Sequence, residues 1–566
     1  MKPDPLLPAP HARLLSNGRY FTFITAAGTG QSRRHGHVVN RWHGDQVEDA
    51  QGQFIYLRDL DTGTLWSAAM QPVKCGSTSY QSSDLPGSFR ITSESNGIRS
   101  QLDIAVSPND DLEVRRLQLT NLTKRPRRIE VTSFIEAVLT WQGADIGHPA
   151  FSKLFVQTSR EGNTLFAERR PRGADETWPC LFHSLAGATA QSWETDRLRF
   201  LGRGRTAADP RACEAEALSG SIGNVLDPCL SLRTAIQLVA EGEAVLGFVT
   251  GIADSKEQAA SLSMKYGETN SIDHVLNEAV EAEENLRLEH GLDDRTASRF
   301  QSLAAAMHYG HRSLVPPPQE LDPSVAPPVP RDRPTMVLCD GWSAASTQEA
   351  LKARRYWGTK GFYTNFVVFD DSSQTPEGHD DRVFTLSPSV LDERGTSLLY
   401  AIATLVVKGA LPEINNNHAP GAPPAVAKVE CGDSGFSDEK LRFFNGYGGF
   451  SEDGHEYVIR LPHDGERPPM PWINVVANEQ AGFLVSESGA GCTWTRNSQA
   501  NRLTPWSNEP ASDPHGEAFY LRDEANGEVW SPLPGPVPAA CDHEVRHGLG
   551  ATRFRSACNG IEQDTV

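Results

Sequence analysis

Apolar and polar residues alternate in short runs from residue 19 to about residue 250, and Gly, Asn, Asp or Pro breaks the runs. Such alternation places successive side chains on the two faces of a strand. The clearest pair of predicted strands covers residues 112–119 and 129–139, with a polar turn at 120–126 between them. Because no helical period separates the strands, the pattern predicts a mainly β protein built on a large antiparallel β-sandwich.

Part of this pattern returns near the other end of the chain. Residues 54–67, FIYLRDLDTGTLWS, reappear as residues 518–531, AFYLRDEANGEVWS, with seven of the fourteen positions identical. Each copy has an apolar run, a turn that contains Gly, and a second strand that ends on Trp, which predicts a β-hairpin. We therefore expect two copies of one domain, the second cut short at Val566. Upstream residues match at one common spacing: Asn17 with Asn478, and Gly28 with Gly489.

The apolar period becomes helical near residue 255. Helices are predicted at 257–266, 272–288 and 296–307, and we expect them to form a linker against the edge of the sandwich. Residues 316–334 then hold eight prolines, which indicates a stiff connector and a domain boundary.

A small mixed region follows the prolines, and a second β region begins near Leu441. In the mixed region, strands are predicted at 336–338, 362–369 and 383–386, and helices at 348–357 and at 392–407, the latter capped by Ser389 or Asp392. The predicted domains are a sandwich at 10–254, a helical linker at 255–315, a Pro-rich connector at 316–335, a mixed α/β region at 336–412 and a truncated second sandwich at 441–566.

Composition narrows the possible partners. A net charge of -19 argues against nucleic acid, which needs a basic surface, whereas neutral sugars are compatible with it. No amino-terminal leader is visible, and the longest apolar run, near residues 398–407, is too short to cross a bilayer, so we expect a cytoplasmic chain without a transmembrane segment. Nine scattered cysteines without a CxxC pair indicate reduced, unpaired thiols.

Two histidine groups invite a metal hypothesis. His543 and His547 satisfy the HExxH pattern, but prolines flank the motif closely and the repeat places it on a strand, where the two imidazoles cannot share a metal as they do on a helix. His35, His37 and His43 fit solvated loop positions better than a metal site. We therefore predict neither a metal nor a cofactor.

The long polar loop at residues 489–513 is the strongest candidate for a binding site. Carbohydrate sites combine flat aromatic faces with planar amide, guanidinium and carboxylate groups. An ordered structural loop with its Trp residues packed inward explains the same residues equally well. The candidate carbohydrate-binding residues are Trp494, Arg496, Asn497, Trp506, Asn508 and Asp513.

No serine or cysteine lies in a nucleophile elbow. If the first sandwich supplied an acid for catalysis, Glu136, Asp145 and His148 would be the first residues to test, although polar residues at strand ends are the more ordinary interpretation.

Several longer runs resemble one enzyme family. They include HPAFSKLFV at 148–156, FFNGYGGF at 443–450, PWINVVAN at 471–478 and LTPWSNEPASD at 503–513. Together with the hairpin runs they are similar to glycoside hydrolase family 94, the cellobiose and chitobiose phosphorylases once called glycosyltransferase family 36. The likeness is greatest to the carboxy-terminal part of cyclic β-1,2-glucan synthases. It implies a galactose-mutarotase-like β-supersandwich, with a second partial sandwich after the linker.

Family members carry their general-acid Asp on an (α/α)6 barrel, and phosphate attacks the sugar there. About five helices are predicted here, so the resemblance implies that the barrel and its Asp have no counterpart in this chain. The expected function is a noncatalytic portion that binds a β-glucan or a glucooligosaccharide, with a catalytic barrel or a glucan synthase subunit as a further partner. The alternatives are an active glycosyltransferase or phosphorylase, alone or with a separately encoded barrel, and a structural subunit.

Overall fold

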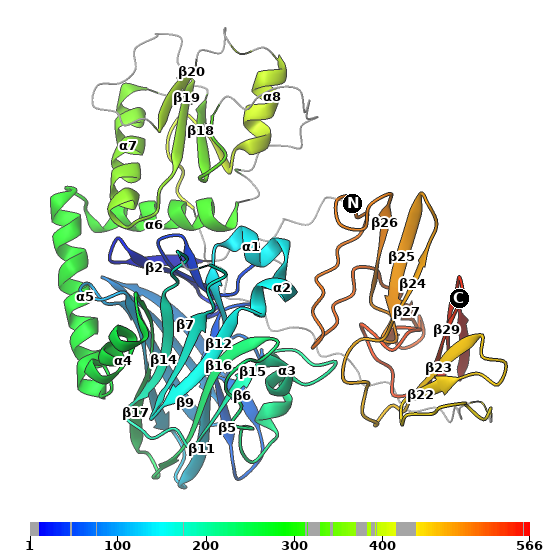
Figure 1. The fold of residues 1–566 in the computed structure, drawn as a ribbon. Coiled ribbons are helices and arrows are strands. Elements are labelled where there is room, and N and C mark those ends of the chain that lie inside the picture. Colours follow the sequence, from blue (N-terminus) through cyan, green and yellow to red (C-terminus); the bar gives the residue numbers. More distant parts are fainter. Residues whose placement is uncertain are drawn as a thin grey trace. The chain divides into compact units, whose positions relative to one another are not determined.

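The computed structural model describes residues 11–414 and 437–566, apart from 46–47, 75, 174, 312–313, 315–328, 340–342, 370–381, 387–390, 392, 438 and 559. The chain divides into two compact units, which are described separately (Figure 1). Unit 1 contains residues 1–196 and 215–422, and unit 2 contains residues 197–214 and 423–566. A short segment from the middle of the first β region therefore belongs to unit 2, which the sequence did not indicate.

Two antiparallel sheets form the sandwich of unit 1, which confirms the predicted fold class. The first sheet contains β1 (Ala12–Ser16), β2 (Tyr20–Thr25), β3 (Gly30–Arg34), β4 (His37–Asn40), β5 (Gln53–Asp59), β6 (Leu65–Ser67), β11 (Arg127–Thr140), β15 (Ser192–Asp196) and β16 (Pro228–Leu238). The second contains β7 (Ser79–Leu85), β8 (Ser88–Ser95), β9 (Ile98–Val106), β10 (Leu112–Asn121), β12 (Val156–Glu161), β13 (Thr164–Arg169), β14 (Cys180–Ala186) and β17 (Glu243–Ala253).

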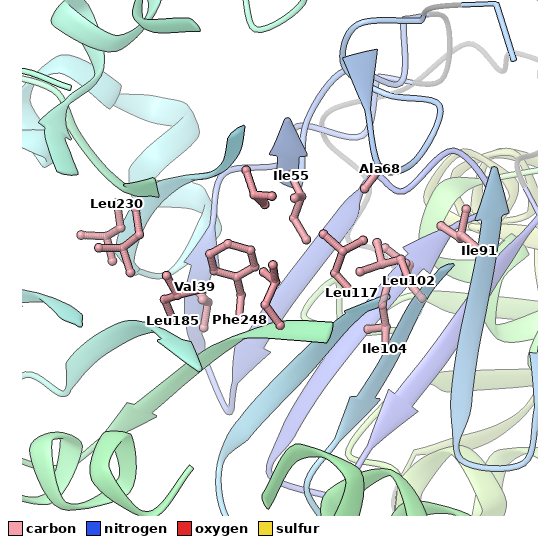
Figure 2. Close-up of a cluster of buried hydrophobic side chains, with 14 of the residues drawn as sticks. Val39, Ile55, Ala68, Ile91, Leu102, Ile104, Leu117, Leu185, Leu230 and Phe248 are labelled. Carbon is pink, nitrogen blue, oxygen red and sulfur yellow. The ribbon is translucent and has the colours of Figure 1, made fainter. Parts of the chain in front are cut away.

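The two sheets bury one apolar core between their facing sides (Figure 2). Ile55 of the first sheet and Ile104, Leu117 and Phe248 of the second are at most 5% exposed. Period-2 alternation produces this core because every second side chain of a strand points the same way. The interior between the sheets is the main hydrophobic stabilisation of unit 1.

The clearest predicted pair of strands is wrong as a pair. Both segments are strands, but β10 pairs with β9 and β17, whereas β11 pairs with β4, β5 and β16 of the other sheet. The polar turn thus crosses between the layers. Sequence pattern gives the strands but not their neighbours, because a hairpin and a crossover between sheets need the same turn residues.

Helices α4 (Lys256–Lys265), α5 (Thr269–Glu289) and α6 (Asp294–Tyr309) confirm the three predicted linker helices. Ser255 caps α4 and Asp293 caps α6, each by accepting a backbone N–H bond. The predicted packing against a sheet edge is confirmed for α6, which contacts the edge strand β1, and is wrong for α5. Ile272 and Val275 of α5 are buried on the outer face of the second sheet, beside which Figure 1 shows α4 and α5.

The mixed region is built on one parallel sheet, in which the strand order is β20-β19-β18-β21. The predicted helix at 392–407 is wrong beyond residue 402, because Leu405–Lys408 pairs with β18 as a strand. The proposed caps, Ser389 and Asp392, lie outside the described residues. The elements are β18 (Thr335–Cys339), α7 (Ala344–Thr359), β19 (Asn365–Phe369), β20 (Val383–Leu386), α8 (Glu393–Ile402) and β21 (Leu405–Lys408).

Unit 2 contains three small antiparallel sheets within the described residues. The first follows the order β22 (Gly448–Phe450), β23 (Glu456–Leu461), β29 (His543–Gly548), β30 (Thr552–Cys558) and β31 (Ile561–Thr565). The second contains β24 (Ile473–Ala477), β25 (Ala481–Ser486) and β26 (Gly491–Thr495), and the third contains β27 (Leu521–Arg522) and β28 (Val529–Trp530).

The repeat is confirmed at the level of single hydrogen bonds. Leu57 lies opposite Trp66 in the first hairpin, and Leu521 lies opposite Trp530 in the second. The side-chain oxygens of Asn17 and of Asn478 each accept the backbone N–H groups two and three residues later, at 2.8–3.0 Å. Gly28 and Gly489 have φ of 87° and 90°, so each fills a left-handed position that favours glycine.

The expectation that every thiol is unpaired is wrong at one place. Cys541 and Cys558 form a disulfide with their Cα atoms 5.8 Å apart. They lie opposite each other across the β29–β30 hairpin, in which His543 faces Ser556. Linear spacing could not reveal the pair, because the hairpin register brings the two together. The other described cysteines are all buried: Cys180, Cys213, Cys229, Cys339 and Cys492.

Candidate functional site

The polar loop at 489–513 divides into residues that hold it together and residues that face solvent. Trp494 is buried beside Leu484 and Cys492, with Trp506 partly buried against them. Asp513 is buried too, and its carboxylate accepts hydrogen bonds from Ser486 and Ser488 at 2.7 and 2.6 Å. Trp494 and Asp513 therefore shape the loop from inside.

Asn497 also serves the loop backbone, because its side-chain oxygen accepts the N–H groups of Gln499 and Ala500 at 2.9 and 2.7 Å. Asn497 is nevertheless exposed, and three further predicted residues also reach solvent. Arg496 and Asn508 are exposed, and Trp506 is half-buried with the Arg502 guanidinium carbon 5.7 Å from the centre of its ring. The structure thus leaves one aromatic ring, one guanidinium and two amides of the predicted set at the loop surface.

Two arginines from the segment at 197–214 anchor this loop within unit 2. Arg203 bridges Glu487 and Asp513, with N–O distances of 2.6 and 3.2 Å. Arg197 pairs with Glu509 at 2.6 Å. Although burial favours its protonated form, the Arg197 charge and nearby hydrogen bonds lower the pKa of Glu509 to about 2. No sequence pattern pointed to these arginines, since about 300 residues separate them from their partners.

The first sandwich brings Glu136 and Asp145 together around Arg41. The Arg41 guanidinium lies 2.7 Å from Glu136 and 3.0 Å from Asp145, all largely buried. Burial opposes ionisation of Asp145, yet hydrogen bonding to His43 and the Arg41 charge together hold its pKa well below the usual range. Asp145 is therefore an anion that orients Arg41, and it holds no proton to donate near neutral pH. His148 is exposed between α1 (Gln142–Gly147) and α2 (Pro149–Lys153).

An aromatic row lies beside this cluster and was missed in the sequence. It consists of Trp141, Trp178, Arg169, Phe155 and Phe151, in that order. Ring centres of Trp141 and Trp178 are 6.4 Å apart, and those of Phe155 and Phe151 are 5.1 Å apart. The guanidinium of Arg169 lies between the two pairs, 5.1 Å from Trp178 and 5.8 Å from Phe155.

Both ends of the aromatic row face solvent, because Trp141 is 57% exposed and Phe151 is 56% exposed. Large aromatic side chains are rarely left open without a function when they gather in one patch. The HPAFSKLFV run contained the two Phe residues, but nothing in the sequence linked them to Trp141 or Trp178. The fold does so through α1, α2 and the β12–β13 hairpin.

The histidine motifs do not assemble a metal site. His543 and His547 lie on β29, where His547 bonds the carbonyl of Trp472 at 3.0 Å. His37 stands edge-on to Trp178, and His43 lies 3.7 Å from Asp145. Within the described residues no group of three potential ligands is close enough to hold a metal ion. No helix in the same residues is long and apolar enough to span a membrane.

Comparison with known proteins gives the family. The profile of the glycosyl hydrolase 94 supersandwich domain matches residues 1–269 and again 455–566, which agrees with the internal repeat. The cyclic beta-(1,2)-glucan synthase NdvB of Rhizobium meliloti is 31% identical over 620 aligned positions, which cover 100% of this chain and 22% of that protein. The N,N'-diacetylchitobiose phosphorylase of Vibrio furnissii is 36% identical over 118 positions, 20% of this chain and 14% of that enzyme.

Among solved structures, a putative aldose 1-epimerase from Escherichia coli K12 matches with a TM-score of 0.27 and 10% identity, covering 43% of this chain and 99% of that one. The chain spans about a fifth of the length of the glucan synthase. Since the domain profile matches well over half of the residues, the chain belongs to the family of the glycosyl hydrolase 94 supersandwich domain.

Proposed function

We propose that the chain is a carbohydrate-binding, noncatalytic portion of a cyclic β-1,2-glucan synthase or of a family 94 glycoside phosphorylase. Family membership supports a role in carbohydrate chemistry. The alignment with a glucan synthase, which runs over the whole of this chain, favours β-glucans as the ligand. The observation that carries the proposal is the aromatic row, whose exposed Trp141 offers a flat face to sugar C–H surfaces.

Two surfaces share this proposed role. On unit 1 the exposed ends of the aromatic row supply stacking faces, and the buried guanidinium of Arg169, which donates to the carbonyl of Val138 and the hydroxyl of Ser152, holds the row together. On unit 2 the exposed Arg496 and Asn508 and the half-buried Trp506 supply the same kinds of group on a smaller scale. Trp494, Asn497 and Asp513 would then act indirectly, by fixing the shape of the loop.

The ionised state of Asp145 favours a noncatalytic role over an acid catalyst in the sandwich. A general acid must hold a proton near the working pH. The Arg41 and His43 contacts keep Asp145 ionised, and Glu136 lies 2.7 Å from the same guanidinium. We infer that chemistry on the bound glucan belongs to a catalytic barrel or a glucan synthase subunit as partner.

We further propose that the chain works in the cytoplasm. The buried thiols of Cys180, Cys229 and Cys492 are consistent with a reducing compartment. The Cys541–Cys558 disulfide would be expected in an oxidising one. Thiol trapping in freshly lysed cells decides the question, because a fully oxidised pair would place the chain in an oxidising compartment.

Calorimetric titration with β-1,2- and β-1,4-glucooligosaccharides tests the binding role. We expect Trp141→Ala to weaken binding about tenfold, since a lost stacking face costs about 1.4 kcal/mol. Ile146→Ala is the matched control, because Ile146 is 54% exposed on α1 and lies outside the aromatic row. If Trp506→Ala weakens binding and Trp141→Ala does not, the loop is the site. Absence of binding to every oligosaccharide would overturn the proposal.

Release of glucose 1-phosphate tests the noncatalytic role. We expect none above the buffer background when the chain is incubated with phosphate and β-glucooligosaccharides. Phosphorolysis by the isolated chain, lost in Glu136→Gln or Asp145→Asn, would identify an enzyme instead.

A further inference from the structure

Helix α6 covers one face of the first β-hairpin in unit 1. Ala12 and Leu14 of β1 are 2% and 0% exposed, and they lie in one apolar cluster with Phe300 and Ala304 of α6. The cover includes a polar contact. Because β1 is the edge strand, the outward N–H of Leu14 has no strand partner, and it donates to the side-chain oxygen of Gln301 at 3.1 Å.

The corresponding face of unit 2 is open. The offset that joins Asn17 to Asn478 places Ile473 at the position of Ala12 and Val475 at that of Leu14. Ile473 is 46% exposed and Val475 is 56% exposed. Scattered exposed apolar residues are ordinary, but these two share one face of one strand. Leu484, directly opposite Val475, is already buried beside Trp494, so the open part of the face lies along β24.

The strand edge is open as well. Val475 pairs with Leu484 in the register in which Leu14 pairs with Phe23, and β24 is an edge strand as β1 is. The Val475 N–H therefore points away from the sheet, as the Leu14 N–H does, and no acceptor for it is found among the described residues. In unit 1, Gln301 accepts the equivalent backbone N–H, and the apolar side of α6 covers the equivalent apolar positions. Unit 2 therefore presents the two features that α6 satisfies in unit 1.

We propose that the exposed edge of this face, formed by Ile473 and Val475 of β24, is a docking site for an amphipathic α-helix of the α6 type. The helix would place small and large apolar residues over the strand, and one amide side chain would accept the N–H of Val475. The repeat supports this choice of partner. In unit 1 the equivalent edge strand β1, paired in the same register, is covered by such a helix. This inference is independent of sugar binding.

The test uses the full chain and a fluorescent peptide of residues 293–310, the α6 sequence with its cap. A hydrocarbon staple between positions 298 and 302 keeps the peptide helical, and Ser298 is exposed in α6. We expect saturable binding by fluorescence anisotropy. Val475→Lys should weaken the binding at least tenfold, and a Gln301→Ala peptide should bind more weakly than the parent peptide.

Leu549→Lys is the matched control, because Leu549 is 95% exposed in unit 2 but lies outside this face. Absence of saturable binding by the stapled peptide would overturn the proposal, and so would binding that Val475→Lys leaves intact. Loss of glucooligosaccharide binding in Val475→Lys would assign the face to sugar instead. A concentration-dependent dimer that Val475→Lys abolishes would assign it to a second copy of the chain.

Discussion

The first and second copies of the repeat share their turns and differ in their surroundings. Both hairpins keep the same register, and Trp66 and Trp530 are each 1% exposed. The Asn-Gly-Ile run at residues 96–98 returns at 559–561, so β31 is the counterpart of β9. In the first copy, β9 lies between β8 and β10 in an eight-stranded sheet, whereas β31 has β30 as its one neighbour among the described strands. Short motifs therefore fix local geometry, while stability and binding depend on what covers them.

Replacement of the tryptophan that both hairpins share should give the largest difference in stability between the two copies. Trp530→Ala leaves a large cavity in a small cluster and should cost about 4 kcal/mol. Trp66→Ala costs a similar amount, but in the much larger core of unit 1. We therefore expect Trp530→Ala to unfold unit 2 alone, which limited proteolysis would detect as cleavage confined to the two segments of unit 2, residues 197–214 and 423–566. In the wild type, earlier cleavage in the first sandwich than in unit 2 would contradict this order of stability.

The disulfide should give the next largest effect, because the first copy has none among its described residues. Cys541 and Cys558 are 17 residues apart, and cross-linking a loop of that size stabilises a domain by about 3 kcal/mol. We expect Cys541→Ser, or reduction, to lower the unfolding midpoint of unit 2 in guanidinium chloride. Cys492→Ser is the control, since it changes a buried free thiol of the same unit. An unchanged midpoint on reduction would show that the disulfide contributes nothing.

Acid should weaken unit 2 through Glu509. The folded pKa is about 2, below the ordinary value of 4.5, so the stabilisation is complete above pH 4.5 and is lost as pH falls toward 2. Allowing for partial exposure, the loss is about 2 kcal/mol. Glu509→Gln should lower stability at neutral pH and flatten this part of the pH profile. Glu524→Gln, at an exposed acid of the same unit, should leave the profile unchanged.

The turn asparagines should give the smallest effect and the finest comparison. Asn478→Ala removes two hydrogen bonds to turn amides and should cost about 1 kcal/mol. Asn17→Ala should cost more, because the Asn17 amide also donates to the carbonyls of Ser107 and Asp110 at 2.9 and 3.0 Å. Chemical unfolding of both variants, each followed in its own unit, measures the difference. Equal losses would mean that the extra contacts of Asn17 are energetically neutral.

Sequence patterns predicted the elements better than the site. Alternation located the strands, and the helical period of apolar residues located the linker helices, since both depend on residues close together in the chain. Of the predicted loop residues, Arg496, Trp506 and Asn508 face solvent, while Trp494 and Asp513 point inward. Pattern alone could not separate these groups, because aromatic and polar residues suit both a binding surface and the inside of an ordered loop.

The sequence by itself determined the β class, the linker helices, the repeat and the family, because each is a local or additive property of the chain. Tertiary structure alone decided which strands share a sheet, that Arg203 reaches Asp513, and that Trp141 and Trp178 meet in one row. It also decided that Leu14 lies under α6 while Val475 stays open. These outcomes depend on contacts between segments that are far apart in the chain. Strand register and packing determine such contacts, and the order of residues alone does not reveal them.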